Sequence, residues 1–554
     1  MEERRLLVAV ALSLVVLTAY SLLFAPPSPP PSPAPAASPS AAPAAPTPPP
    51  TAEAAAPVPK TAATTPAVED EKERRVEVQA EDYTVAFTNR GARVVSWTLS
   101  RFRDASGHPE EMVPALGQVV RPLDVETGDA ALDARLREAL FKPSAEAVTV
   151  SGAEPQTLRF AFSDGDVEAE KTLVFPPSGL VTVSVRVTRQ GRELPSRVLW
   201  GPGVGNATPE EREVRGYQAP RGVAYSGGSV EYLVAAKLPP TGRPLAGVGW
   251  VGVESQYFAA LFVAPAGGAA AEVRPQTTPA QADEKPSVAP VVAIDASGPE
   301  PVRLFVGAKD YRSLAKLGHH LERVVPIGDW IGPIVVPLMA ALRWVHSRVG
   351  NWGWAIVVVT VLINMALAPF RHYSIVNSLK MAKLQPEMKA IQDRYRKVPM
   401  MDPRRQKMQE EVQALYAKHG MSMGSQMMVG CLPLLLTMPF LFAFYRVLTV
   451  SIELRGAPFL WISDLAQKDP LFLTPVLMGL SMFAMQKMTP STMDPAQQRI
   501  MMLMPLMLAG MFLWAPAGLN LYWLTSNLWS ILQQAVSMRL LHPSLVPARE
   551  KRAR

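Results

Sequence analysis

The hydrophobic residues of this chain gather in long runs, and the first run begins almost at the N-terminus. Residues 6–24 (LLVAVALSLVVLTAYSLLF) contain no charged residue and are long enough to cross a bilayer core of roughly 30 Å. Two arginines precede this run, which places the N-terminus in the cytoplasm. Leu23 stands where a signal-peptidase site ending at Ala25 requires a small residue. We therefore expect an uncleaved anchor over 1–25, with a cleaved signal peptide as the alternative.

The composition and then the periodicity change after this anchor. Residues 26–69 are rich in Pro, Ala, Ser and Thr, which disfavours a packed core and favours an extended tether. Further on, Val181–Val187 alternates valine with Thr, Ser and Arg, as in a strand with one buried face. Other short β-like runs lie at Tyr83–Phe87, Leu158–Phe162 and Leu304–Val306. We expect one large antiparallel all-β domain over 70–312, outside the cytoplasm because the first span delivers it there.

From about residue 311 the spacing of apolar residues becomes helical. The apolar face of a short helix consists of Leu314, Leu317, Leu321, Val324 and Val325. We expect an amphipathic interfacial helix and its lead-in over 313–350, with a plain connecting helix as the alternative. Long apolar runs fill 351–538, and several contain Pro or Gly, which neighbouring helices tolerate. The five expected spans lie near 353–370, 429–450, 471–488, 500–515 and 518–537.

Lysine and arginine are distributed unevenly around these spans. The loop 371–425 contains eleven of them and the tail 539–554 contains five, whereas the loop 451–470 contains only Arg455 and Lys468. Because positively charged loops remain in the cytoplasm, the first loop and the tail are predicted to be cytoplasmic. The pattern therefore predicts a polytopic α-helical membrane protein with six spans and both termini in the cytoplasm.

The basic loop also has a helical pattern. Apolar residues repeat at helical spacing on both sides of two prolines, in the order Leu384, Met388, Ile391, Tyr395, Pro399, Pro403, Met408, Val412 and Leu415. This spacing predicts a helical hairpin over 373–420, either a docking surface for substrate or ribosome or simply a solvated structural element. The basic tail 539–554 has the charge to bind ribosomal RNA phosphates. A lipid contact or a topology signal is the alternative.

Ionisable residues are scarce in the five C-terminal spans. Arg446 is the one clear charge inside a span, and neither a histidine nor an Asp/Glu pair lies there. An intramembrane protease or a proton-coupled transporter would need such groups. Cys431 is the single cysteine, which excludes a disulfide scaffold and a thiolate metal cluster. We expect no enzymatic activity, no cofactor and no metal.

Uncharged polar residues occur in the spans instead. Thr360 and Asn364 are one helical turn apart, with Arg371 on the same stripe at the cytoplasmic end. The last span places four residues on one face, namely Trp523, Asn527, Ser530 and Gln534. Single residues of this kind often join helices to each other, but the set favours a shared polar groove for the polar flanks of an incoming segment. Methionine also clusters, at 421–428 and 501–511, as an adaptable apolar surface or as ordinary filler.

Seven stretches of the C-terminal half match a known family in its order. They are NWGWAIVVVT (351–360), LQPEMKAI (384–391), GCLPLLLTMPFLFAFYRVL (430–448), ELRGAPFLWISDLAQKDP (453–470), MQKMTP (485–490), MDPAQQ (493–498) and GLNLYWLTSNLWSILQQ (518–534). With these stretches the chain resembles the YidC/Oxa membrane protein insertases, and its full layout is similar to the Gram-negative form. The β region is matched more weakly, by WVGVESQYFAALFV (250–263).

The resemblance implies an insertase and chaperone that places transmembrane segments of nascent membrane proteins into the lipid bilayer. It implies partnership with the Sec translocon and with ribosomes carrying those chains. The implied fold is a β-supersandwich outside the cytoplasm and a core of five helices around a hydrophilic groove, with a mobile cytoplasmic hairpin. Mapped onto this chain, the groove would include Thr360, Asn364, Thr437, Trp523 and Asn527, to which the polar face of the last span adds Ser530.

One position departs from the family pattern. The family usually carries a positive residue, commonly arginine, where this chain has Asn364. Arg446 is the candidate substitute, and it either faces the groove or extends to the outer interface.

Two other functions remain as alternatives. A polytopic transporter would be expected to show internal repeats or midplane ion ligands, and neither is found. A sugar-active enzyme in the β domain is suggested because such supersandwiches resemble epimerase folds. It would need a histidine with a carboxylate, and the β region offers only His108 in a polar stretch.

Overall fold

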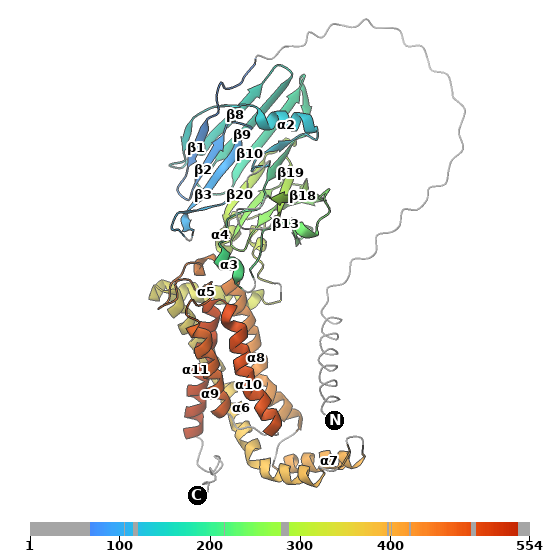
Figure 1. Cartoon of the computed structure of the whole chain (residues 1–554), viewed down its shortest axis with the longest axis vertical. Helices are drawn as coiled ribbons and strands as arrows, with labels where there is room; N and C mark the ends of the chain where they lie inside the picture. Colours follow the sequence, from blue (N-terminus) through green and yellow to red (C-terminus); the bar gives the residue numbers. More distant parts are fainter. Residues whose placement is uncertain are drawn as a thin grey trace, which may run out of the picture. The chain divides into compact units, whose positions relative to one another are not determined.

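The structure is a computed structural model of the chain (Figure 1). It describes residues 67–540 except 105, 115–119, 215–216, 279–286, 329, 396–397, 400–401, 420–422 and 489–494, and for 209–210, 405, 423–436, 495–500 and 540 it describes the backbone alone. The predicted anchor, most of the predicted tether and nearly all of the basic tail therefore lie outside the described residues.

The first part of the described chain forms three β-sheets (Figure 1). One consists, in spatial order, of β4 (Pro109–Glu111), β3 (Arg93–Arg103), β2 (Tyr83–Thr88), β1 (Arg75–Gln79) and β7 (Ala147–Thr149). The largest consists of β14 (Ser229–Leu233), β13 (Arg221–Ser226), β16 (Trp250–Glu254), β17 (Phe258–Val263), β20 (Val302–Ala308), β10 (Val181–Arg189), β9 (Val167–Phe175), β8 (Gln156–Ser163) and β6 (Lys142–Pro143), with β11 (Arg192–Leu194) beside β10. The third consists of β15 (Arg243–Val248), β18 (Ala269–Thr278), β19 (Ser287–Asp295), β12 (Arg197–Trp200) and β5 (Val125–Glu126).

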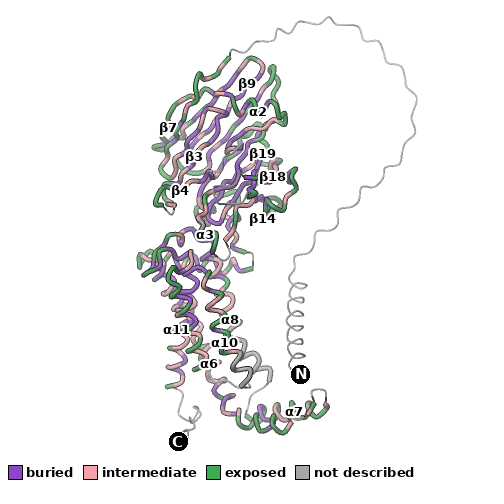
Figure 2. Tube along the Cα trace, viewed as in Figure 1, coloured by how far each residue is buried: buried purple, intermediate pink, exposed green. Residues whose placement is uncertain are grey.

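The four predicted β-like runs are confirmed as strands β2, β8, β10 and β20. In β9 and β10 buried residues alternate with more exposed ones, because successive side chains of a strand point to opposite faces. Figure 2 shows buried residues along many of these strands. The prediction of a purely antiparallel domain is wrong at one edge, where β1 pairs with β7 in parallel. The intervening β2 to β6 supply the long connection that a parallel pair requires.

The link to the helical part is not the single amphipathic helix that the spacing predicted. Helix α4 (Tyr311–Leu317) ends at Gly318, and His319 and His320 have positive φ angles of 54° and 58°. A short 3-10 helix, η2 (Leu321–Val324), follows. The apolar residues of both short helices pack into one buried cluster. For this reason their spacing in the sequence looks like that of a single helix across the break. The longer helix is α5 (Gly332–Val349), which buries Val335, Leu338 and Leu342 and exposes Trp344.

Five helices occupy the positions of the five predicted C-terminal spans. They are α6 (Trp352–Arg394), α8 (Met423–Val450), α9 (Leu473–Met488), α10 (Pro495–Met511, continued by η4, Phe512–Trp514) and α11 (Ala517–Leu540). Of the described residues, one helix, α6, has both the length and the apolar composition to cross a membrane. Thr437–Val450 and Met501–Trp514 are shorter apolar helices.

Helix α6 is longer than the span predicted near 353–370. It continues without a break through Pro369 and Pro386 to Arg394, and at 1.5 Å per residue its 43 residues extend about 65 Å. The predicted span and the first arm of the predicted hairpin are therefore one helix. The second arm is α7 (Arg404–Lys418), which shares a small apolar core with the end of α6 and is otherwise largely exposed (Figure 2).

The β domain and the helical part are joined by charged contacts to the loop between α8 and α9. Arg455 in this loop, just after η3 (Ile452–Leu454), donates to Glu110 at 2.8 Å and to Glu211 at 2.6 Å. Glu211 lies in the short helix α3 (Pro209–Glu213), which lies next to this loop in Figure 1. Gln256 also donates to the carbonyl of Thr449, at 3.3 Å. These contacts fix the loop against the β domain.

Candidate functional site

A cavity of about 650 Å³ opens among α6, α8, α9, α10 and α11. Its lining differs from side to side. Helices α6 and α11 contribute most of the polar groups, namely Arg371, Ser374, Ser378, Ser526, Asn527, Ser530, Gln533 and Gln534. Helices α8, α9 and α10 contribute mostly apolar residues, namely Met438, Leu441, Met482, Met485 and Met501, with Thr437 among them. The cavity is therefore amphipathic, and its apolar side is built from flexible, polarizable methionines.

The polar side is held by hydrogen bonds between α6, α9 and α11. Ser526 of α11 donates to Asn364 Oδ1 at 3.2 Å, and Asn364 in turn donates to the carbonyl of Thr360 at 2.7 Å. Asn527 donates to Ser481 of α9 at 3.0 Å. Because few other partners for polar groups exist among apolar helices, these bonds fix the positions of the side chains that line the cavity.

The predicted site residues fall into three groups. Thr437, Trp523, Asn527 and Ser530 line the cavity. Thr360 and Asn364 do not line it: both are buried, Asn364 is hydrogen-bonded to the lining residue Ser526, and Thr360 is linked to it only through Asn364. Arg446 is half-buried in α8, lies outside the lining, and makes no side-chain hydrogen bond or ion pair with any residue that the structure describes.

Arg371 is the charged residue of the lining, and the sequence-based list of groove residues did not include it. It lies seven residues, about two turns, after Asn364 on α6, and its guanidinium donates to Ser530 Oγ. Its position on the stripe of Thr360 and Asn364 was visible in the sequence, but the span was predicted to end near residue 370, which placed Arg371 at its cytoplasmic end. Since α6 continues through Pro369, the arginine stays on the face that borders α11.

The described part of the lining carries no compensating negative charge. Among the described residues, neither Asp nor Glu lines the cavity, and no carboxylate forms an ion pair with Arg371. A cation in an environment of low dielectric constant attracts an anion more strongly than it would in water. The cavity is thus suited to a ligand that carries both an apolar surface and an acidic or polar flank.

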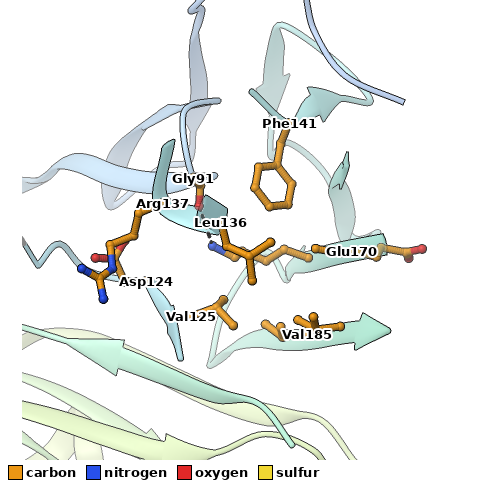
Figure 3. Close-up of a pocket in the computed structure, with 11 residues that line it drawn as sticks. Gly91, Asp124, Val125, Leu136, Arg137, Phe141, Glu170 and Val185 are labelled. Carbon is orange, nitrogen blue, oxygen red and sulfur yellow. Dashed lines mark hydrogen bonds between the residues drawn. The ribbon is translucent and has the colours of Figure 1, made fainter. Parts of the chain in front are cut away.

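The β domain contains a much smaller space. A cavity of about 10 Å³ is bordered by Gly91, Asp124, Leu136 and Phe141 (Figure 3). Lys171 lines it too, fully buried, and donates to the carbonyls of Gly91, Ala92 and Leu123 at 2.6–3.2 Å. Burial lowers the pKa of Lys171 to about 7. The space holds one water at most, so this lysine connects β9 to the turn before β3 and the loop before β5 and does not bind a substrate.

Neither an enzymatic nor a metal site emerges from the described residues of the β domain. His108 is exposed in the turn between β3 and β4, with Asp104 as its neighbour at 3.8 Å. Groups of three or more His, Cys, Asp and Glu side chains placed to hold a metal are absent from the described part of the chain.

The chain thus combines a helical part that contains an amphipathic cavity with a large β domain, the architecture of a polytopic membrane protein with an extramembrane domain. Two family models cover most of the chain: "YidC periplasmic domain" matches residues 75–341, and "60Kd inner membrane protein" matches residues 344–544. The chain belongs to the YidC family.

Relatives match over nearly the full length. The membrane protein insertase YidC of Geobacter metallireducens is 32% identical over 550 residues, covering 96% of this chain and 98% of the relative. The protein of the same name from Geobacter sulfurreducens is 33% identical over 458 residues, covering 82% of this chain and 84% of the relative. A crystal structure of an active YidC insertase is 18% identical, with a TM-score of 0.34, and covers 86% of this chain and 95% of that one.

Proposed function

We propose that this chain is a membrane protein insertase and chaperone, and that the cavity among α6, α8, α9, α10 and α11 holds the polar flank of an incoming transmembrane segment. The observation that carries the proposal is the unpaired guanidinium of Arg371 in an amphipathic cavity without carboxylates among its described lining residues. Family membership supports the activity itself.

The chemistry follows from the two sides of the cavity. A charged side chain placed alone at the centre of a bilayer raises the free energy by about 2.5–3.5 kcal/mol on insertion scales. Hydroxyl and amide groups such as Ser526, Asn527 and Gln533 replace part of the lost hydration. The methionine side adapts to apolar segments of different shapes. The segment can then leave toward lipid while its flank is still solvated.

Arg371 adds selectivity for charge. Acidic residues of the flank gain a direct electrostatic partner there, and neutral flanks do not. The family pattern places the positive charge of the groove at the position of Asn364, and the sequence offered Arg446 as its substitute. We propose that Arg371 supplies this charge here. We assign the groove to Arg371, Thr437, Trp523, Asn527 and Ser530, with Thr360 and Asn364 supporting it from behind.

The surroundings of the cavity suggest its topology and partners. We propose six spans, with both termini in the cytoplasm, because lysine and arginine are concentrated in 371–425 and 539–554. Exposed lysines on the hairpin, such as Lys380, Lys389 and Lys407, suit contact with a ribosome that carries a nascent chain. The Sec translocon is a further proposed partner, with insertion proceeding either alone or beside it.

A photo-crosslinking amino acid on α11 tests the assignment. Placed at Ser526, it points into the cavity, whereas at Leu528, two residues further on, it lies on the exposed side of the same helix. With a ribosome stalled on a nascent membrane protein, we expect a crosslink from position 526 and a much weaker one from 528. Equal crosslinks, or a crosslink from 528 alone, would place the substrate outside the cavity.

A further inference from the structure

The loop between α8 and α9, Ser451–Leu473, turns its charged groups inward. Its five ionisable side chains are Glu453, Arg455, Asp464, Lys468 and Asp469. Glu453 pairs with Arg343 of α5 at 2.5 Å, Arg455 pairs with Glu110 and Glu211, and Lys468 pairs with Glu213 at 2.5 Å. Asp464 and Asp469 are buried and accept hydrogen bonds from within the loop and the start of α9.

The exposed residues of the same loop carry no charge. They are Gly456, Pro458, Leu460, Trp461, Ser463, Pro470, Leu471, Phe472 and Leu473. Leu460 is 70% exposed and Leu471 is 65% exposed. A loop that faces water normally exposes its charged residues and buries its leucines and aromatic residues. This loop does the reverse.

Two of the exposed apolar residues, Leu460 and Phe472, occupy strained backbone positions. Phe459 and Ile462 exchange two backbone hydrogen bonds, of 2.8 and 2.9 Å, around a tight turn with Leu460 and Trp461 at its tip. Leu460 has φ of 53°, in the left-handed region where such turns favour glycine. Phe472, just before α9, has φ of 52°. Large side chains at two positions suited to glycine are held outward against a steric penalty.

The turn is nevertheless rigidly held. A Cβ atom on Gly353 of α6 would lie 2.1 Å from Phe459 Cδ2, so the phenyl ring lies directly on the helix backbone. Trp461 Nε1 donates to Asp469 Oδ1 at 3.1 Å, and Asp469 also accepts the Thr474 backbone N–H at 2.7 Å. One carboxylate therefore ties the turn to the start of α9.

We propose that Leu460, Trp461, Leu471, Phe472 and Leu473, the loop tip, insert into the boundary between headgroups and acyl chains of the leaflet on the β-domain side. The proposal requires only that α9 lies in the membrane, and it is independent of what occupies the cavity.

Continuity with the exposed apolar face of α9 identifies lipid as the occupant. Val476, Leu480 and Phe483 are exposed along α9, and they continue the apolar surface of Leu473. With 16 residues, α9 is about 24 Å long, shorter than a hydrocarbon core of roughly 30 Å. The loop tip extends the apolar surface beyond the first turn of the helix. Trp461 suits the interfacial region, where tryptophan is enriched.

Site-specific fluorescence tests this placement. The full-length protein carrying Cys431→Ser receives one cysteine, Leu460→Cys, labelled with an environment-sensitive fluorophore. It is reconstituted in vesicles of phosphatidylethanolamine and phosphatidylglycerol. Nitroxide lipids report contact with lipid, and iodide present on both sides of the vesicle reports contact with water. Val234→Cys, on the exposed surface of the β domain, is the water-facing control, and Leu506→Cys, exposed on α10, is the lipid-facing control.

We expect the Leu460→Cys label to be quenched by nitroxide lipids as the Leu506→Cys label is. Its iodide quenching should be about threefold weaker than at Val234→Cys, as for a residue in the interface. The Leu471→Cys label should give the same result. Because Leu471 lies outside the strained turn, this variant shows whether the substitution at Leu460 has disturbed the turn locally. Iodide quenching equal to that at Val234→Cys would place the loop tip in water. Protection from both quenchers would show a protein on this surface. Either result overturns the proposal.

Discussion

Arg455 Nη1 lies 2.8 Å from Glu110 Oε2, although 345 residues separate the two in the chain. Glu110 is almost completely buried, and Glu211 holds the other side of the same guanidinium. Burial raises the pKa of Glu110 above its usual range, and Arg455 opposes this rise only in part. One arginine thus pairs with two buried carboxylates between the β domain and the loop that precedes α9.

Replacing this arginine should destabilise the protein. Arg455→Leu leaves Glu110 and Glu211 buried without a cation, and breaking such a pair typically lowers the free energy of unfolding by about 3–5 kcal/mol. Because the pKa of Glu110 is raised in the folded state, protonation stabilises folding at low pH, and this stabilisation disappears as pH rises. Thermal unfolding should therefore show a larger loss at pH 8 than at pH 5. A loss that is equal at both values would mean that Glu110 does not carry the effect. Lys468→Leu, which removes the partner of the exposed Glu213, is the control and should change little.

Removal of residues 80–300 should leave insertion intact but lower the thermal stability of the helical part. The cavity and the helices around it lie after residue 350, whereas the deletion takes away Glu110, Glu211 and the surface that covers Ile452 and Ala466. We expect insertion per folded molecule close to that of the full chain, together with a lower unfolding temperature. Adding Arg455→Leu to the deleted chain should cause little further loss, since Glu110 and Glu211, the partners of this arginine, are then absent. Complete loss of insertion by a stably folded deletion variant would show that the β domain takes part in insertion itself.

The charge of the cavity should affect acidic substrates selectively. Arg371→Ala should reduce insertion of segments with acidic flanks by about tenfold, the equivalent of about 1.4 kcal/mol, and leave neutral ones nearly unchanged. Arg371→Lys should keep most of the activity. Asn364→Arg in the Arg371→Ala protein should restore part of it, because the two positions share one face of α6.

Arg446→Ala is the matched control for that experiment, since Arg446 carries the same charge but does not line the cavity. Insertion assays with paired acidic and neutral substrates distinguish these variants. If Arg446→Ala impairs acidic substrates and Arg371→Ala does not, the assignment of the groove charge is wrong.

The packing of α9 against α10 should not accommodate a side chain at Gly479. A Cβ there would lie 2.8 Å from Ala509 Cβ, so Gly479→Ala forces the two helices apart and should destabilise by about 1–3 kcal/mol. Gly510→Ala is the control, because nothing lies within 4 Å of its Cβ position. We expect Gly479→Ala to lower the unfolding temperature in detergent and Gly510→Ala to leave it unchanged or raise it. Equal unfolding temperatures would show that α10 moves freely relative to α9.

Local features of this protein were determined by the sequence alone. The alternation in Val181–Val187 predicts a strand, and the structure has β10 there. The helical spacing of Trp523, Asn527, Ser530 and Gln534 predicts one face of one helix, and all four residues line the cavity. Such features can be predicted because the period of a strand or helix repeats within a few residues and needs no distant partner.

Only the tertiary structure decided which groups meet. The sequence marked Arg446 as the charge inside a span, but the residue in the cavity is Arg371, because α6 continues through Pro369 and packs against Ser530 of α11. Neither the pairing of Glu110 with Arg455 nor the parallel contact of β1 with β7 has a local signal. In each case the partners lie far apart in the sequence, and their contact depends on how whole helices and sheets pack against each other. Burial and pairing of a charge are properties of that packing, and a periodic pattern of side chains contains no information about them.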